Sequence, residues 1–424
     1  MLDIKFIREN KEIIDISAKK KHVDFKVSDL LTVDDKRKKL TASVEKKRAE
    51  QNAMSQKIAQ ATSPEERESL ISPMKVVKEA LQKEETELQG VMKEWQALMV
   101  RVPNVPDISV PEGESDADNV EVRTWGEHTR FTFKPKDHVE LMEANDMVDF
   151  ERGTKVAGFR GYILKNDGAL LDFAVWQFVL EHFTKRGLKP MIVPSLVKKE
   201  LLLGTGYLPQ GEEDLYKTQD DMYLAGTGEV AVMGYFGGEV LDKKDLPIKY
   251  LAFSPCFRRE AGSHGKDVKG IYRVHEFMKF EQLVLCEASH EESVKLHEEI
   301  TLNAEEMMQA LNIPHRVVLN CGADLGLGQV KKYDIEAWTP SKDGYGETHS
   351  ASYFHDFQTR RLNIRYRDED GKMRFVHSLN NTATATPRLL ISIVENYQNE
   401  DGTIRVPEVL KKYIGKDILG KPKA

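Results

Sequence analysis

Charged and aromatic residues gather around a glycine-containing segment in the middle of the chain. The set comprises Arg258, Glu260, Arg273, Phe277 and Glu281. Guanidinium groups suit phosphate or carboxylate, an aromatic ring suits a base, and carboxylates suit amines or a metal ion. These residue types favour a site for a nucleotide plus a small cationic group. On residue chemistry alone, a salt-bridged hairpin surface without a ligand explains them about equally well.

A strand, a long turn and a second strand must position these side chains. Apolar and β-branched residues flank a loop with several glycines, which is typical of two strands joined by a turn. Strand side chains alternate between faces. We therefore expect Arg258 and Glu260 to share one face, and Arg273, Phe277 and Glu281 to share one face of the return strand.

Two later segments add groups that bind ions. Glu347 and Ser350 are of opposite strand parity, which means that in a regular strand their side chains point to opposite faces. They could bind the same metal ion only if a bulge or a similar irregularity turned both to one face. Thr386 suits a helix N-cap and Pro387 suits the first helical position, which places Arg388 in the first turn. A helix N-terminus with an arginine favours an anion. Taken alone, an amphipathic helix with an exposed arginine is the more frequent explanation.

Several motifs in order resemble the class II aminoacyl-tRNA synthetases, and most closely the seryl-tRNA synthetase family. F-R-x-E, a loop and R-x-x-x-F resemble the second class II motif, and residues 379–396 resemble the third. A helical pattern over 169–183 and a strand ending at Pro194 resemble the first, which packs at the family's dimer interface. Thr227-Gly228-Glu229 resembles the T-x-E serine motif. Residues 347–361 resemble E-x-x-S followed by D-F-Q-x-R-R.

The resemblance covers nearly the whole chain and implies both a fold and a reaction. The expected fold is α+β: an N-terminal antiparallel coiled-coil arm, then an antiparallel β-sheet flanked by helices. Serine would attack the α-phosphorus of ATP to give seryl-adenylate and pyrophosphate, and a tRNA hydroxyl would then take the seryl group. The implied cofactors and partners are ATP, Mg²⁺, L-serine, tRNA(Ser), in many members tRNA(Sec), and a second copy of the chain.

The resemblance also implies roles for individual residues. Arg258 would neutralise the serine carboxylate and the α-phosphate, and Arg388 the distal phosphates. Phe277 would stack on adenine, and Glu347 and Ser350 would hold magnesium. The serine contacts are expected from Thr227, Gly228, Glu229, Glu281 and Thr382. The ATP contacts are expected from Arg258, Arg259, Glu260, Phe277, Glu347, Thr348, His349, Ser350 and Arg388. Gly228, Arg259 and His349 depart from the residues usual in the family.

The N-terminal part has a different pattern of apolar residues. Apolar residues recur at three- and four-residue spacing over 34–61 and again over 64–100, with Ser63 and Pro64 at the second start. Two long helices joined by a short turn form an antiparallel coiled coil. The first helix carries a local surplus of basic residues, for which a solvated helix face is the usual explanation. The resemblance instead implies a tRNA-binding arm, with contacts expected from Lys36, Arg37, Lys46, Lys47 and Arg48.

The sequence also predicts domain boundaries and a cellular location. The expected division is 1–105 for the tRNA-binding domain, 106–125 for a proline-rich linker and 126–424 for the catalytic domain. Net charge is −7 and there are three widely spaced cysteines, which argues against a disulfide framework or a zinc site. No targeting or membrane segment is visible, so a cytoplasmic location is expected.

Two other functions remain open at this stage. A synthetase-like ligase that charges a carrier protein would keep the catalytic motifs, although such relatives lack the long arm. A non-catalytic coiled-coil binding protein would keep the arm, but need not retain Arg258, Glu260, Glu281, Glu347 and Arg388 together.

Overall fold

The computed structural model describes residues 1–262 and 269–420. Contacts divide the chain into two compact units, one of Leu2–Lys19 and Val23–Pro103, the other of Met1, Lys20–His22 and Asn104–Ala424. The main division thus lies between Pro103 and Asn104, close to the expected end of the first domain. No helix in the described part is both long and apolar enough to cross a membrane.

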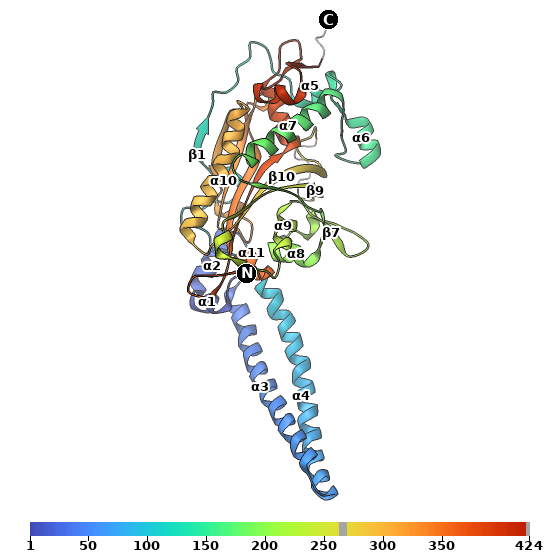
Figure 1. Cartoon of the computed structure of the whole chain (residues 1–424), viewed down its shortest axis with the longest axis vertical. Coiled ribbons are helices and arrows are strands. Elements are labelled where there is room, and N and C mark those ends of the chain that lie inside the picture. Colours follow the sequence, from blue (N-terminus) through green and yellow to red (C-terminus); the bar gives the residue numbers. More distant parts are fainter. Residues whose placement is uncertain (263–268, 421–424) are drawn as a thin grey trace. The chain divides into compact units, whose positions relative to one another are not determined.

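The N-terminal unit is helical. Its helices are α1 (Ile4–Glu9), α2 (Lys11–Lys20), α3 (Val27–Gln60) and α4 (Pro64–Met99). Helices α3 and α4 run side by side as a long hairpin (Figure 1). Ser63 caps α4 by accepting a hydrogen bond of 3.1 Å from the Glu66 backbone N–H, and Pro64 occupies the first turn, as the sequence predicts. Helix α3 starts before the expected Asp34.

The second unit is built on an eight-stranded sheet with the order β1-β11-β12-β13-β16-β10-β9-β4. Neighbouring strands are antiparallel except β4 and β9, which are parallel. The strand bounds, in the order of the sheet, are Val120–Trp125, His315–Leu319, Lys331–Thr339, Gly344–His355, His377–Ala385, Glu276–Cys286, Ile248–Phe257 and Lys189–Ile192.

The expected linker is not free of regular structure. Strand β1, residues Val120–Trp125, falls within 106–125 and pairs with β11 at the edge of the sheet. The valines at 120 and 122 suit a strand, but the neighbouring prolines and acidic residues hide that signal. Residues 120–125 therefore belong to the sheet.

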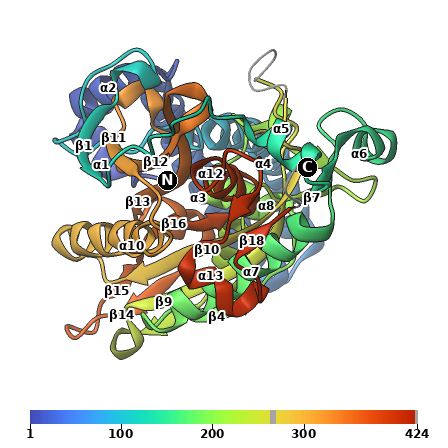
Figure 2. The ribbon, with the colours of Figure 1, turned by 90° about the horizontal axis from the view of Figure 1, so that it is seen from above.

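Helices cover the sheet on both faces. On β10, Val284 packs with Leu296 of α10 (His290–Ala310), whereas Leu285 packs with Val230 of α9 (Glu229–Tyr235). Successive strand residues point to opposite faces, so α10 and α9 lie on different sides. Helices α7 (Asn166–Thr184), α12 (Thr386–Asn396) and α13 (Glu408–Ile414) add a large apolar core beside β9 and β10 (Figure 2).

Short elements complete this unit. The remaining helices are α5 (His138–Ala144), α6 (Phe150–Ala157), α8 (Lys199–Thr205) and α11 (Phe357–Leu362). The remaining strands are β2 (Val148–Asp149), β3 (Ile163–Leu164), β5 (Leu196–Lys198), β6 (Tyr216–Lys217), β7 (Met222–Leu224), β8 (Val240–Asp242), β14 (Arg365–Arg367), β15 (Met373–Phe375), β17 (Ile404–Arg405) and β18 (Ile418–Leu419). The three cysteines are buried and free.

Candidate active site

Four parts of the sheet domain meet at one cavity. They are the residues around the β9–β10 loop, the middle of β13, the end of β16 and the start of α12. The cavity is lined by Arg258, Glu260, Tyr272, Arg273, Val274, Phe277, Lys279, Glu347, Thr348, Thr382, Ala385, Pro387 and Arg388. The fold thus brings together charged and aromatic residues from segments more than a hundred positions apart in the sequence.

Arg388 is held at this cavity by contacts on several sides. Its Nη1 lies 3.2 Å from Glu347 Oε2 and donates to the Glu347 carbonyl oxygen at 3.1 Å. Its guanidinium carbon lies 4.5 Å from the centre of the Tyr272 ring. Burial opposes ionisation of Glu347, but the positive charges of Arg388, Lys332 and Arg258 outweigh it and lower the pKa of Glu347. The cavity therefore holds a preformed pair of opposite charges.

The start of α12 differs slightly from the expectation. The helix begins at Thr386, and the N-cap is Ala385 rather than Thr386. Alanine has no side chain that can accept a hydrogen bond, so the exposed backbone donors of the first turn have no side-chain cap. Arg388 nevertheless lies in the first turn, as predicted, and an anion there would meet both its guanidinium and the helix N-terminus.

Arg258 is the second cation at the cavity, and it faces the ring of Phe277. The guanidinium carbon of Arg258 lies 5.5 Å from the centre of the Phe277 ring, and Arg258 Nε donates to the Gly226 carbonyl oxygen at 3.3 Å. Arg273 pairs with Glu260 at 3.2 Å. Arg259, in contrast, is exposed outside the cavity, where its side chain donates to the Glu213 carbonyl oxygen. Of the two adjacent arginines, the fold brings only Arg258 to the site.

The bulge required by the parity of Glu347 and Ser350 is present. Glu347 pairs with Glu336 and His349 pairs with Ile335, so Thr348 is the extra residue on β13. Glu347 and Thr348 line the cavity, but His349 and Ser350 are not among its lining residues. His349 is 1% exposed, and burial lowers its pKa to about 3. His349 thus packs as a neutral ring behind the cavity.

Asp334, which the sequence interpretation passed over, lies behind Ser350 on β12, where the two residues pair. Burial and the charge of Glu347 raise its pKa to about 6, against the opposing effect of Lys332. Asn320 donates to Asp334 Oδ2 at 2.7 Å. Asp334, Glu347 and Ser350 are therefore near one another on β12 and β13, and of the three only Glu347 lines the cavity.

A buried polar cluster adjoins the cavity on the β10 side. Thr227 donates its hydroxyl hydrogen to Glu281 Oε2, and the Glu229 backbone N–H donates to the same oxygen at 2.8 Å. Lys279 donates to Glu281 Oε1 and to Thr227 Oγ1, both at 2.9 Å. Thr382 is paired with Glu281 across the β10–β16 ladder. Four residues predicted to contact serine, Thr227, Glu229, Glu281 and Thr382, are therefore neighbours.

Glu229 faces away from the cavity. Its two carboxylate oxygens accept from Gln358 at 2.8 Å and from the Tyr207 hydroxyl at 3.0 Å. Burial and the nearby charge of Glu281 raise the pKa of Glu229 to about 7. At Gly228, an added Cβ would lie 3.2 Å from Ser254 Oγ and 3.6 Å from Glu281 Oε2. A small residue there would need only a slight shift of the cluster.

The basic residues of the arm are mostly paired. Lys36 pairs with Glu87 at 2.9 Å, Lys47 with Glu84 at 2.5 Å and Arg48 with Glu85 at 2.7 Å. Arg37 pairs with Asp34 within α3 at 2.8 Å. Lys46 is exposed and forms no ion pair with any residue in the described part of the chain. The surplus of positive charge on α3 is thus largely balanced by acidic residues of α4.

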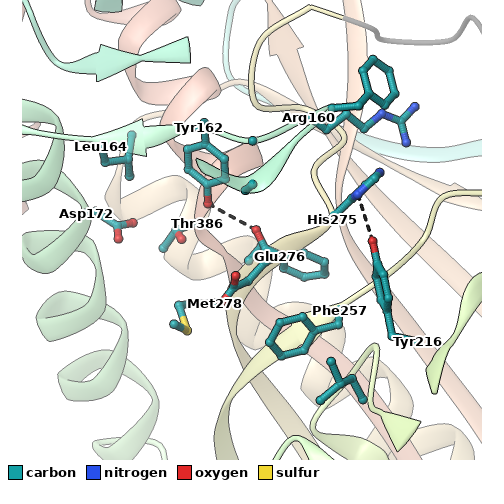
Figure 3. A pocket seen from close by; sticks show the side chains of 15 residues that line it. Arg160, Tyr162, Leu164, Asp172, Tyr216, Phe257, His275, Glu276, Met278 and Thr386 are labelled. Carbon is teal, nitrogen blue, oxygen red and sulfur yellow. Dashed lines mark hydrogen bonds between the residues drawn. The ribbon is translucent and has the colours of Figure 1, made fainter. Parts of the chain in front are cut away.

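A larger cavity of about 440 Å³ lies on another side of Phe277. Figure 3 shows its lining, in which Tyr216 and His275 share a hydrogen bond of 2.9 Å and Tyr162 lies beside Glu276. Burial raises the pKa of Asp172, which also lines it. Apart from Phe277, none of the residues predicted to bind substrates lines this cavity.

Lys279 and Tyr272 are the charged and aromatic cavity residues that sequence reasoning missed. Lys279 has the same strand parity as Phe277 and Glu281, so the alternation of β10 already predicted its face. A charged residue within the apolar run Phe277–Leu285 was the signal. Tyr272 gave no comparable signal, because it lies in the loop before β10 and its place depends on Arg388.

Comparison with known proteins gives matches along the whole chain. Residues 1–106 match the seryl-tRNA synthetase N-terminal domain, and residues 213–397 match the tRNA synthetase class II core domain (G, H, P, S and T). Serine–tRNA ligase of Deinococcus radiodurans is 45% identical over 100% of both chains. The enzyme of Treponema denticola is 43% identical over 99% of this chain and 100% of its own.

Solved structures agree with these matches. Seryl-tRNA synthetase from Pyrococcus horikoshii, complexed with ATP, superposes with a TM-score of 0.90 at 39% identity and 100% coverage of both chains. Cytoplasmic serine–tRNA ligase from Naegleria fowleri, in complex with AMP, gives a TM-score of 0.87 at 31% identity, covering 100% of this chain and 99% of its own. The expected helical arm and helix-flanked sheet are confirmed.

Proposed function

Because this chain belongs to the seryl-tRNA synthetase family and ligates serine to tRNA, we propose that the cavity between β10, β13 and α12 carries out both steps of the reaction. The observation that carries this assignment is the convergence of Arg258, Phe277, Glu347, Thr382 and Arg388 on one cavity. No residue needs to act as a covalent nucleophile. Positioning and neutralisation of charge supply the rate enhancement.

ATP occupies the part of the cavity between Phe277 and Arg388. The ring of Phe277 stacks on adenine, and Arg388 at the start of α12 binds the distal phosphates. Arg258 neutralises the α-phosphate and the serine carboxylate while new charge develops during the attack. Glu347 must then exchange its contact with Arg388 for a contact to the nucleotide or its metal ion.

We place magnesium beside Glu347, with Ser350 on the same strand as a second oxygen donor. Mg²⁺ prefers oxygen ligands and is commonly held by one or two carboxylates together with substrate phosphates. Glu347 and Ser350 would hold it, because the bulge at Thr348 overcomes their opposite strand parity. When bound, the ion neutralises phosphate charge.

Serine binds beside β10, where Glu281 and Thr382 receive its side-chain hydroxyl and Thr227 contacts its ammonium group. A site built to hydrogen-bond a hydroxyl rejects an analogue without one, because buried polar groups lose their partners. Alanine is therefore a poor substrate. Glu229 supports this site indirectly, since its own carboxylate is bound by Tyr207 and Gln358.

The arm formed by α3 and α4 binds tRNA(Ser) by neutralising phosphates. The described ion pairs make Lys46 a stronger candidate for a direct contact than Lys36, Lys47 or Arg48. We include tRNA(Sec) as a second substrate on the family resemblance alone, and the same resemblance supports a cytoplasmic location. Charging of each purified tRNA tests the two substrates separately.

The chain functions as a homodimer through α7 and β4. Phe173 on α7 is 63% exposed and Ile192 on β4 is 85% exposed, and Leu170 and Leu180 on α7 are also exposed. Large apolar side chains as exposed as Phe173 and Ile192 suit a surface that a second chain covers. Sedimentation of the wild-type chain and of Phe173→Glu tests this assignment: the variant is expected to sediment as a monomer.

ATP–pyrophosphate exchange against a panel of amino acids, with Mg²⁺ and without tRNA, tests the proposed function. Exchange that depends on serine alone supports it. Exchange with another amino acid contradicts the assignment of the serine site. Absence of exchange with every amino acid would contradict the assignment of the activation step to this cavity.

A further inference from the structure

Lys279 is a buried cation next to the serine site. It lies on β10 between Phe277 and Glu281, and only 6% of its surface is exposed. Lysine is almost never buried unless it is paired. Its ammonium group donates at 2.9 Å to both Glu281 Oε1 and Thr227 Oγ1. The lysine thus bridges two of the residues to which serine binding is assigned.

The hydrogen bonds within this cluster leave donor and acceptor positions free for a substrate. Glu281 accepts from Lys279 through Oε1, and from the Thr227 hydroxyl and the Glu229 backbone N–H through Oε2. An ionised carboxylate has about four acceptor positions, and an ammonium group has three donors. Glu281 therefore retains about one acceptor position, and Lys279 retains a donor. Of Lys279, Thr227 and Glu281, only Lys279 lines the cavity directly.

The charge balance of the cluster depends on Lys279. Glu229 and Glu281 are both buried, and repulsion between them favours a proton on one of the two. Arg258 also lies in the surroundings of the cluster. Burial raises the pKa values of Tyr207 and Cys256, so both are neutral at pH 7. Lys279 is the cation that contacts Glu281 directly among the residues the structure describes.

We propose that Lys279 is a positioning and specificity-determining residue for serine. Its ammonium group fixes the Glu281 carboxylate in place, oriented to accept the serine hydroxyl. Without Lys279, Glu281 keeps only the contacts of Thr227 and the Glu229 backbone at Oε2, and Oε1 loses the partner that orients it. The inference rests on the proposed serine site.

Lys279→Met tests the proposal, because methionine has a similar shape without the charge, and Lys279→Arg is the matched control that keeps the charge. The measurement is serine-dependent ATP–pyrophosphate exchange between pH 6 and 9. In Lys279→Met we expect KM for serine to rise roughly 30-fold to 1,000-fold, the range for removing one partner of a buried charged hydrogen bond.

Three further readouts separate this role from a purely structural one. ATP affinity without serine should stay within about three-fold of wild type, since the ATP contacts do not involve Lys279. Lys279→Arg should raise KM for serine less than Lys279→Met does and keep the wild-type pH dependence. L-2,3-Diaminopropionate should compete better against serine in Lys279→Met, because its β-ammonium group replaces the missing charge.

An unchanged KM for serine in Lys279→Met would overturn the proposal. Equal losses of ATP and serine binding would also overturn it, because they indicate general damage to the fold. Should Lys279→Met fail to fold, Lys279→Gln, which also removes the charge, replaces it in the same assay, and an unchanged KM for serine in that variant would overturn the proposal. Serine-dependent exchange by the wild-type chain tests the serine site independently.

Discussion

The arm and the catalytic cavity use the same charged residue types in opposite ways. In the arm, Lys47 and Glu84 form an ion pair of 2.5 Å between two partly exposed side chains. In the cavity, Lys279 and Glu281 form one of 2.9 Å with 7% and 3% of their side chains exposed. Water screens the first pair, so it can be exchanged for a phosphate at little cost. The second is protected from water, and losing either partner leaves an uncompensated charge.

The difference explains why charge alone is a poor guide to function in this chain. The basic surplus on α3 is conspicuous in the sequence, yet acidic residues of α4 pair with much of it. The single lysine in β10 is inconspicuous, yet it lies among residues that surround the proposed serine site. Burial, which converts a modest attraction into a strong constraint, decides which charges matter most.

The variant with the largest expected effect changes the catalytic cavity and leaves the arm intact. Arg388→Ala should reduce serine-dependent exchange by roughly 1,000-fold or more, because it removes a partly buried cation that stabilises phosphate charge. Affinity for tRNA(Ser), measured by filter binding at fixed salt, should remain nearly unchanged, because the arm is intact. A comparable loss of tRNA affinity would break the division of labour between arm and cavity.

Thr382→Ala addresses the serine site alone. We expect KM for serine to rise roughly 10-fold to 100-fold, with KM for ATP unchanged, because one hydroxyl partner is lost. Thr382→Ser keeps the hydroxyl and serves as the control in the same exchange assay. If both variants behave alike, the methyl group rather than the hydroxyl of Thr382 determines binding.

His349 provides a test of burial behind the cavity. Its pKa of about 3 lies below the ordinary value of 6.5 because burial disfavours the charged ring. The unfolded chain therefore binds the proton more readily, so His349 destabilises the fold as pH falls from 6.5 toward 3, by at most about 1.4 kcal/mol per pH unit. Denaturant unfolding of His349→Ser should show a shallower loss of stability over that range. An unchanged slope would mean that other buried histidines dominate.

The smallest expected effect concerns the arm. Lys46→Ala should weaken tRNA(Ser) binding about two-fold to five-fold and lower the slope of log Kd against log salt concentration by about 1, as for one lost phosphate contact. Lys47→Ala, the control, should change binding less, because Lys47 is already paired with Glu84. Exchange without tRNA should be unaffected in both. The reverse order of the two effects would show that the ion pairs open on binding.

The sequence alone predicted the long helices of the arm and the motif segments that carry the site. Periodicity and the Ser63-Pro64 cap predicted α3 and α4 as separate helices, and strand parity at Glu347 and Ser350 predicted the bulge that the structure shows at Thr348. Residue types in the motifs were enough to identify Arg258, Phe277, Glu347 and Arg388 as candidates. These signals are local, because they depend on the repeat of a helix or strand and on the chemistry of single side chains.

The tertiary structure decided which candidates meet. It moved Arg259 out of the cavity, placed His349 behind it and brought Lys279 against Glu281 and Thr227. It also paired the arm's basic residues with acids on the partner helix and made a strand of 120–125. Such outcomes depend on burial and on register between segments distant in sequence. A single sequence carries the residues for these contacts, but only packing sets the distances and the dielectric that give each charge its role.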